Sequence, residues 1–494
     1  MSRKKQATNS SSSSSRQRNK AIKSRLKELS KASQEKNHVV LKGLMNLIFV
    51  DNTVFTKTMF HGNIKWLPEQ LTIQALIWTW QDSKCVTDAF DRSLEICHQL
   101  GLAETAKTYT AFMNALSRYR DIMVNRLRFQ FQDLAETFGG QYFRTDGWVL
   151  MAFDGSRATA PRTKANEEAF CAPNYGQGEK AKYGKKVSPE SPRKAEAPEP
   201  QVWLTLMWHM GLRLPWTWRL GPSNSVERQH VFDILKTENF PEETLFCGDA
   251  GFVGYEFWKA IMEKPAHFLV RVGANVKLLS EYADIKKKGG GIVLCWPKGM
   301  MDSGKPPLRL RLVRVKVGKR PMWLLTSVLN EKELTKKQMA RYYELRWGVE
   351  VEFRGLKQTI DKHKLKCRNN ERLLSELDWS LLGMAFAELL ALSQQIPRER
   401  SKDSNNYDPK DRSLAETVRA LRWSMRNLDE AFDAKNCLLA KLTQALVQRY
   451  KNNTDKKARY RPRKRKKELG DPEIRKLTAA ERKKLKQLTP QKAA

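Results

Sequence analysis

Hydrophobic positions along the chain follow two different patterns, a helical spacing and continuous apolar runs. Between residues 38 and 147, apolar side chains recur every three to four residues, as in LTIQALIWTWQ and in the long segment 109–138. This spacing places them on one face of a helix and predicts a helical N-terminal domain. The run WVLMAFDGS (148–156) is instead continuously apolar up to its Asp-Gly pair, which predicts a buried strand that ends in a turn.

Strand-like segments dominate the middle of the chain. VWLTLMWHMG and LPWTWRLG predict a hairpin across Gly211, and a helix is expected from about Ser225. TLFCGDAGF (244–252) repeats the pattern of an apolar run followed by an acid, and a block of further strands follows it. The chain then becomes helical. Its most apolar stretch, Trp379 to Leu392, contains Glu388 and is too short to cross a bilayer, so it predicts a buried helix.

These elements and the shifts in composition predict an α/β protein built from seven segments. In chain order these are a disordered basic arm (1–37, helical at most from Ala21), a helical N-terminal domain that could bind DNA ends (38–147), the first part of an α/β core with a lysine- and proline-rich loop at 157–200 (148–275), a β-rich insertion (276–330), the second part of the core (331–390), a helical C-terminal region suited to dimerisation (391–450) and a basic tail (451–494).

The charge balance points to a polyanionic partner. Of the 494 residues, 90 are Lys or Arg and 54 are Asp or Glu, a formal net charge of +36. Nucleic acid is the first candidate, and a merely solvated basic surface is the alternative. Arg118, Arg120, Arg126 and Arg128 lie on one predicted helix, where they either contact DNA or form its solvated face.

Cysteine usage and the N-terminus predict an intracellular protein. The seven cysteines are scattered without paired spacing, which indicates reduced thiols rather than disulfides or a zinc site. The N-terminus contains basic residues and six consecutive serines, without the apolar segment of a secretory signal. We therefore expect a cytoplasmic, nucleoid-associated protein with no membrane contact.

Four polar residues near position 350 share one helical stripe. In RYYELRWGVEVEFRGLKQ, Tyr343, Arg346, Glu350 and Lys357 fall within an arc of about 60° on a continuous helix. A helix face that carries a carboxylate, two cations and a phenol is not typical of a hydrophobic core. These groups are suited to binding a metal ion together with a phosphodiester. On the same helix Glu352 faces the opposite side, so the period singles out Glu350.

Three carboxylates in chain order form a candidate metal site: Asp154, Asp249 and Glu350. Two unit charges at 4 Å repel by roughly 4 kcal/mol at an effective dielectric of about 20, so such a group needs protons or cations. Oxygen-only ligation suits Mg²⁺ or Mn²⁺. Each acid also has a structural alternative: a turn at Asp154, a helix cap at Asp249, and at Glu350 a surface ion pair with Arg346 or Arg354.

These residues resemble the motifs of the IS4-type DDE transposases. The spacing Y-x2-R-x3-E-x6-K at 343–357 resembles the family signature, FDGSR resembles the stretch with its first aspartate, and GDAGFVGY the stretch with its second. The resemblance implies an RNase H-like catalytic core and a mostly β insertion. It also implies two Mg²⁺ or Mn²⁺ ions held by Asp154, Asp249 and Glu350. Tyr343, Arg346 and Lys357 would contact DNA phosphates, and a homodimer would bring together two terminal inverted repeats and target DNA.

The function expected from this resemblance is cut-and-paste DNA transposition. Family members hold an unstacked base on an aromatic ring, and Trp323 is the candidate here, with a role in the β core as its alternative. Two other functions remain open. An RNase H-like nuclease would share the acids and the charge, and a non-catalytic nucleic-acid-binding protein derived from a transposase would share the charge alone.

Overall fold

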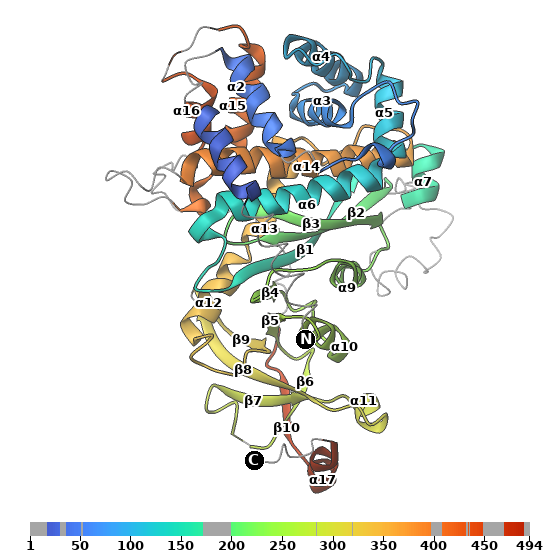
Figure 1. Ribbon diagram of the computed structural model, residues 1–494. Coiled ribbons are helices and arrows are strands. Elements are labelled where there is room, and N and C mark those ends of the chain that lie inside the picture. Colours follow the sequence, from blue (N-terminus) through green and yellow to red (C-terminus); the bar gives the residue numbers. More distant parts are fainter. Residues whose placement is uncertain are drawn as a thin grey trace, which may run out of the picture.

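A ten-stranded mixed sheet with helices on both faces forms the body of the protein (Figure 1). The computed structural model describes residues 17–29, 36–50, 53–170, 199–282, 284–318, 320–396, 408–430, 433, 435–447 and 469–488. The strands are β1 (Val149–Thr159), β2 (Gln201–His209), β3 (Leu214–Pro222), β4 (Thr244–Gly248), β5 (Ala266–Val272), β6 (Lys277–Ser280), β7 (Gly290–Cys295), β8 (Leu308–Val317), β9 (Arg320–Thr326) and β10 (Glu473–Lys476).

The helices come in three groups along the chain. The N-terminal group is α2 (Asn37–Met45), α3 (Pro68–Trp80), α4 (Val86–Gln99), α5 (Tyr109–Arg118) and α6 (Arg120–Gly139). Between the strands lie α7 (Lys164–Phe170), α9 (Glu227–Thr237), α10 (Tyr255–Met262) and α11 (Lys298–Asp302). The last group is α12 (Lys336–Leu345), α13 (Gly348–Arg354), α14 (Asn370–Gln395), α15 (Leu414–Arg426), α16 (Leu438–Thr443) and α17 (Ala479–Leu488).

The strand order contains an RNase H-like core. The order is β10-β6-β7-β8-β9-β5-β4-β1-β2-β3. Strands β1, β2 and β3 form an antiparallel meander, and β4 and β5 add to β1 in parallel. The order β3-β2-β1-β4-β5 is that of RNase H-like proteins, so the expected α/β class is confirmed.

The strands of the predicted insertion continue the same sheet. β9 pairs antiparallel with β5, and β8, β7 and β6 follow it outward. At the far edge β10 pairs in parallel with β6, although it comes from the segment 451–494 that the sequence predicts only as a basic tail. Residues 469–488 of that tail are therefore built into the fold and cover the edge of the sheet.

Two predicted loops are partly regular structure. Residues 17–29 form a helix, so the basic arm becomes helical before Ala21. Ile22 and Leu29 on this helix are buried, and their spacing creates an apolar face. In the loop predicted at 157–200, β1 continues to Thr159 and α7 follows, while residues 171–198 lie outside the described residues.

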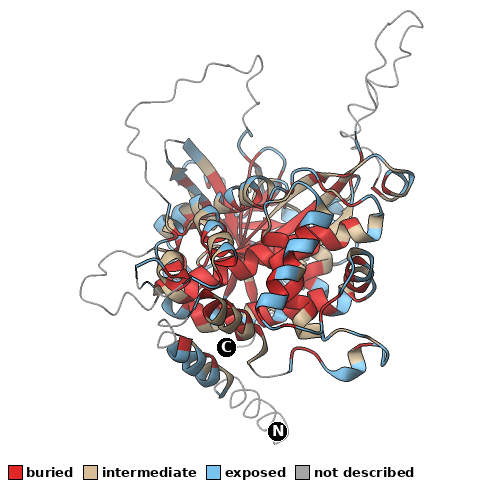
Figure 2. Ribbon diagram, turned by 90° about the horizontal axis from the view of Figure 1, so that it is seen from above, coloured by how far each residue is buried: buried red, intermediate tan, exposed pale blue. Residues whose placement is uncertain are grey.

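The core lies between the sheet and α14, which is buried along nearly its whole length. The prediction of a buried helix at Trp379–Leu392 is confirmed, and the helix extends further in both directions. Figure 2 shows the buried residues gathered at the centre of the molecule. In Figure 1 helices α2–α6, α15 and α16 gather around α14 on one side of β1–β3. Among the described helices, none combines the length and the apolar character that crossing a bilayer requires.

Only some of the four arginines on the predicted basic helix are exposed. Arg128 is buried and forms an ion pair with Glu238, and Arg120 forms one with Asp378 on α14. These two arginines therefore hold α6 against the rest of the protein, and neither predicted role, DNA contact or solvated face, applies to them. Arg118 and Arg126 are exposed and keep both alternatives open.

Candidate active site in the RNase H-like core

Parallel pairing of β1 with β4 brings two of the predicted acids together. The register pairs Ala152 with Cys247. Two residues further along, Asp154 on β1 lies opposite Asp249, which directly follows β4. Neighbouring strands are about 4.8 Å apart, so the two carboxylates share one edge of the core.

Asp154 lies within a strand and not at a turn. β1 continues through Asp154 and pairs with β2 as far as Thr159, so the predicted Asp-Gly turn is wrong. The Gly155 amide donates a hydrogen bond of 2.9 Å to the Asp154 carboxylate. Burial raises the pKa of Asp154, and the charges of Asp249 and Glu350 raise it further, while Arg346 opposes them. The charges of the three predicted acids therefore act on one another.

Asp249 does not cap the helix that follows it. Its Oδ1 accepts a hydrogen bond of 2.7 Å from the Gly251 amide, which forms a local turn. Helix α10 begins six residues after Asp249, at Tyr255, with Gly254 at its N-cap. The capping alternative is therefore excluded, and the carboxylate lies beside Asp154.

The helix that carries Glu350 is broken on both sides. α12 ends at Leu345, Arg346 and Trp347 form a turn, and α13 begins at Gly348. A π-helical turn follows at Gly355–Thr359. The continuous helix assumed for the polar stripe is wrong, because close packing interrupts it: a Cβ on Gly348 would lie 2.2 Å from the Trp208 ring.

Glu350 nevertheless reaches the site from the expected side of the sheet. Asp154, Ala152 and its partner Trp208 share one face of the sheet, since side chains alternate along a strand. That is the face on which α13 packs, because Trp208 contacts Gly348. Glu350 is half-buried, and among the described residues no ion pair holds it, so the surface-pair alternative is not observed.

Tyr343 and Arg346 form a stacked pair beside these acids. The Arg346 guanidinium lies over the Tyr343 ring at 5.4 Å and donates a hydrogen bond to its hydroxyl. Arg346 is only 7% exposed, and its Nε has no hydrogen-bond partner. Burial raises the pKa of Tyr343, against the lowering effect of Arg346. A buried guanidinium with a free donor can receive an anion.

Comparison with protein families gives a match to the part of the chain that contains these acids. Residues 149–382 match the family described as "Transposase DDE domain", a stretch that begins with β1 and ends within α14. The match covers somewhat less than half of the chain. The stretch contains Asp154, Asp249 and Glu350.

Two further comparisons complete the picture. Among solved structures, the chain is similar to a piggyBac transposase in a synaptic complex with hairpin DNA, determined by cryo-EM. The similarity has 13% identity and a TM-score of 0.37, and covers 86% of this chain and 88% of that one. Among curated proteins no sequence matches.

Lys357 follows the short helix α13 that carries Glu350. It lies in the π-helical turn, where the period of an α-helix no longer applies. Burial lowers its pKa, and no charged group contributes to that shift. Its contact with phosphate stays a prediction.

Trp323 lies in the interior of the protein, on β9. It is 3% exposed on β9, its Nε1 donates a hydrogen bond to Asp471, and the Arg314 guanidinium lies over its ring. This position favours its alternative role as part of the β core. A base could stack on Trp323 only if β9 and the segment at Asp471 moved apart.

Two residues near the site were missed by the sequence analysis. Glu227, the first residue of α9, is close enough for the charges of Asp154 and Asp249 to act on it. Trp347 lies in the turn between Arg346 and Gly348, with 60% of its surface exposed. The sequence shows that Trp347 follows Arg346, but the exposure of Trp347 and the position of Glu227 both depend on the tertiary fold.

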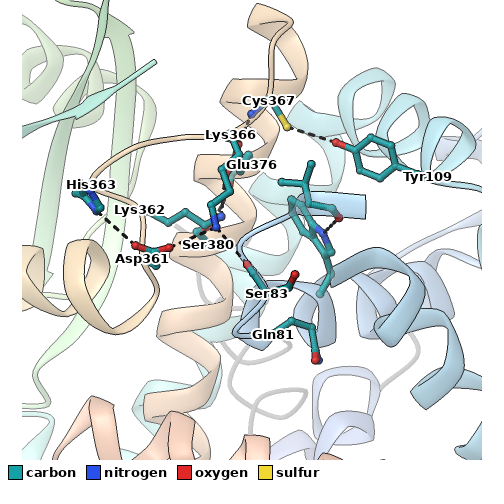
Figure 3. A network of polar contacts seen from close by, with 12 residues as sticks. Gln81, Ser83, Tyr109, Asp361, Lys362, His363, Lys366, Cys367, Glu376 and Ser380 are labelled. Carbon is teal, nitrogen blue, oxygen red and sulfur yellow. Dashed lines mark hydrogen bonds and ion pairs between the residues drawn. The ribbon is translucent and has the colours of Figure 1, made fainter. Parts of the chain in front are cut away.

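Polar contacts anchor the segment that follows the Glu350 helix (Figure 3). Lys362 forms a buried ion pair of 2.7 Å with Glu376 on α14. Lys366 donates to the Ser83 carbonyl, and Cys367 contacts the Tyr109 hydroxyl, so the segment is tied to the N-terminal helices. These contacts fix the chain downstream of Lys357 and thereby the C-terminal end of the site.

The carboxylates fit divalent cations in their chemistry and their backbone positions. All the donors are oxygens, the ligands that Mg²⁺ and Mn²⁺ prefer. The raised pKa of Asp154 reflects burial and uncompensated neighbouring charge, which a cation would neutralise. Within the described ranges, no three His, Cys, Asp or Glu side chains are arranged around a single ion.

Proposed function

We propose that this chain is a transposase that cuts DNA at the ends of a mobile element and joins the freed ends to target DNA. The observation that carries the proposal is the pairing of Asp154 with Asp249 across β1 and β4, within the stretch that matches the DDE domain. Glu350, on α13 over the same face of the sheet, supplies the third carboxylate.

Asp154, Asp249 and Glu350 hold the cations and orient the scissile phosphodiester. Divalent ions held there would supply Lewis-acid activation of a water or 3′-hydroxyl and stabilisation of the leaving oxygen. Arg346 lies beside Asp154 with a free Nε, and this donor binds a phosphate oxygen. Tyr343 positions Arg346 through the stacked, hydrogen-bonded contact.

DNA is the partner that the charge supports. A formal net charge of +36 favours binding to the phosphate backbone regardless of sequence. Trp347, exposed beside the site, offers a ring to an unstacked base at the cut end. Terminal repeats, target DNA and a second copy of the chain complete the proposed synaptic complex.

The test is cleavage of a labelled duplex that carries the two ends of the DNA segment encoding this chain. With Mg²⁺, the full chain should nick the ends and join them to a second duplex. Asp154→Asn, Asp249→Asn and Glu350→Gln should each reduce nicking at least a hundredfold and retain DNA binding. Glu344→Gln, on the exposed side of α12, is the matched control and should cleave normally.

The same experiment separates the alternative functions. Nicking without any joined product would favour an RNase H-like nuclease. Binding without Mg²⁺- or Mn²⁺-dependent cleavage would favour a non-catalytic nucleic-acid-binding protein. Cleavage that survives loss of any one of the three acids would remove that residue from the site.

A further inference from the structure

We propose that Glu227 is a fourth carboxylate of the cation site and binds a divalent ion together with Asp154 and Asp249. This inference rests on the proposed function, because it needs the same cations. It adds a ligand from α9, which lies on the face of the sheet opposite α13.

The position of α9 brings Glu227 against β1 next to Asp154. A Cβ added to Gly155 would lie 2.8 Å from Glu227 Oε1 and 2.6 Å from the Trp203 ring. The absence of a side chain at Gly155 therefore leaves room for the Glu227 carboxylate beside the strand, one residue from Asp154. At this position the charges of Asp154 and Asp249 act on Glu227.

The Glu227 side chain is half-buried, and one of its carboxylate oxygens is unsatisfied. Its Oε1 is shielded from solvent and has no hydrogen-bond partner. Burial raises the pKa of Glu227 to about 8, with further contributions from Asp154 and Asp249 against the lowering effect of Arg346. A buried oxygen without a partner is costly, and a cation would supply the partner.

Charge balance allows a fourth ligand at this position. With Glu227 ionised, two divalent cations and Arg346 would still outweigh the four carboxylates and leave a net positive charge toward the phosphodiester. A role limited to helix capping explains less, because a glutamate at a helix N-terminus is equally favourable when it faces water. Glu256 in the first turn of α10 is such an exposed case.

The test is a titration of the metal-free full chain with Mn²⁺, followed by electron paramagnetic resonance of the free ion. Glu227→Gln keeps the shape of the side chain and removes its charge. It should weaken the binding of at least one Mn²⁺ ion about tenfold or more and reduce nicking of the DNA ends. Glu256→Gln is the matched control, and it should bind Mn²⁺ as the wild type does.

The outcomes distinguish this inference from the proposed function. Wild-type Mn²⁺ binding and cleavage by Glu227→Gln would overturn the fourth ligand and leave the other three acids in place. If the wild type bound Mn²⁺ no more tightly than Asp154→Asn does, both proposals would fail. Thermal melting of each metal-free variant shows whether the fold is retained.

Discussion

Glu352 on α13 and Glu388 on α14 share a hydrogen bond in the interior of the protein. Glu352 is buried on the side of α13 away from Glu350, and Arg213 and Arg412 face the pair. Burial raises the pKa of Glu352 well above its usual range, and the charge of Glu388 raises it further. Glu352 is therefore the protonated partner and donates to the Glu388 carboxylate, which ties the Glu350 helix to α14.

This pair predicts opposite effects of two similar substitutions. Glu352→Gln retains a neutral donor and should change the free energy of unfolding by no more than about 1 kcal/mol. Glu388→Gln removes the charge that faces Arg412 and should cost roughly 3–5 kcal/mol. Urea denaturation measures both. Equal destabilisation by the two variants would contradict the assignment of the proton to Glu352.

Two tryptophans of the region that matches the DDE domain should behave differently when truncated. Trp347→Ala removes an exposed ring, so it should leave stability nearly unchanged and weaken binding of cut DNA ends by roughly 1–3 kcal/mol. Trp323→Ala removes a buried ring and should destabilise the fold by about 3–5 kcal/mol. Thermal melts and DNA titrations at fixed salt measure these effects. Normal end binding by Trp347→Ala would exclude base stacking at that ring.

The stability of the metal-free protein should fall as pH rises. The pKa of Glu227 is about 8 in the folded protein, against an ordinary value of 4.5. The folded state therefore keeps a proton that the unfolded chain releases, so this stabilisation is complete below about pH 4.5 and is lost as pH rises through about 8. The loss should be of order 5 kcal/mol, since each pKa unit corresponds to about 1.4 kcal/mol.

Glu227→Gln isolates that contribution. Denaturation in EDTA at several pH values between 4.5 and 8.5 should show a flatter profile for the variant than for the wild type. Added Mg²⁺ should restore wild-type stability at high pH, because it binds the ionised carboxylate. Parallel profiles for the two proteins would contradict the raised pKa.

The basic cluster of the C-terminal tail should contribute to DNA affinity without sequence preference. Arg463, Lys464, Arg465, Lys466 and Lys467 lie outside the described residues, so only their charge enters the argument. Replacing all five with Gln should reduce the salt dependence of DNA binding by up to about four phosphate contacts. Binding titrations between low and moderate salt measure this slope, and an unchanged slope would mean that the cluster does not contact phosphate.

Deletion of the whole tail is a poorer test of the same point. A chain that ends at residue 450 would also lose β10 and the Asp471 acceptor of Trp323. Its effect would combine lost charge with a disrupted sheet edge. Substitution within 463–467 avoids that ambiguity.

The sequence predicts where the strands of this fold occur better than it predicts where they end. The apolar run before Asp154 predicts β1, but its continuation past Gly155 depends on pairing with β2, which local sequence does not show. The breaks around α13 likewise arise from contacts such as that of Gly348 with Trp208. Periodicity assumes an uninterrupted helix and therefore predicts neither break.

The candidate site was predictable where residues follow strands or carry a motif. Asp154 and Asp249 each follow an apolar run, and the parallel register of β1 and β4 explains why they meet. Glu227 has no such local signal, because an acid at the start of a helix is common. Glu227 lies near the site because of the order of the strands and because Gly155 has no side chain to exclude it.

The most direct test of the central claim is an anomalous difference map from a crystal of this chain soaked in Mn²⁺. The account predicts peaks between the carboxylates of Asp154, Asp249 and Glu350, with two ions about 4 Å apart when DNA is bound. Peaks elsewhere, or these carboxylates more than about 10 Å apart in the DNA complex, would contradict it.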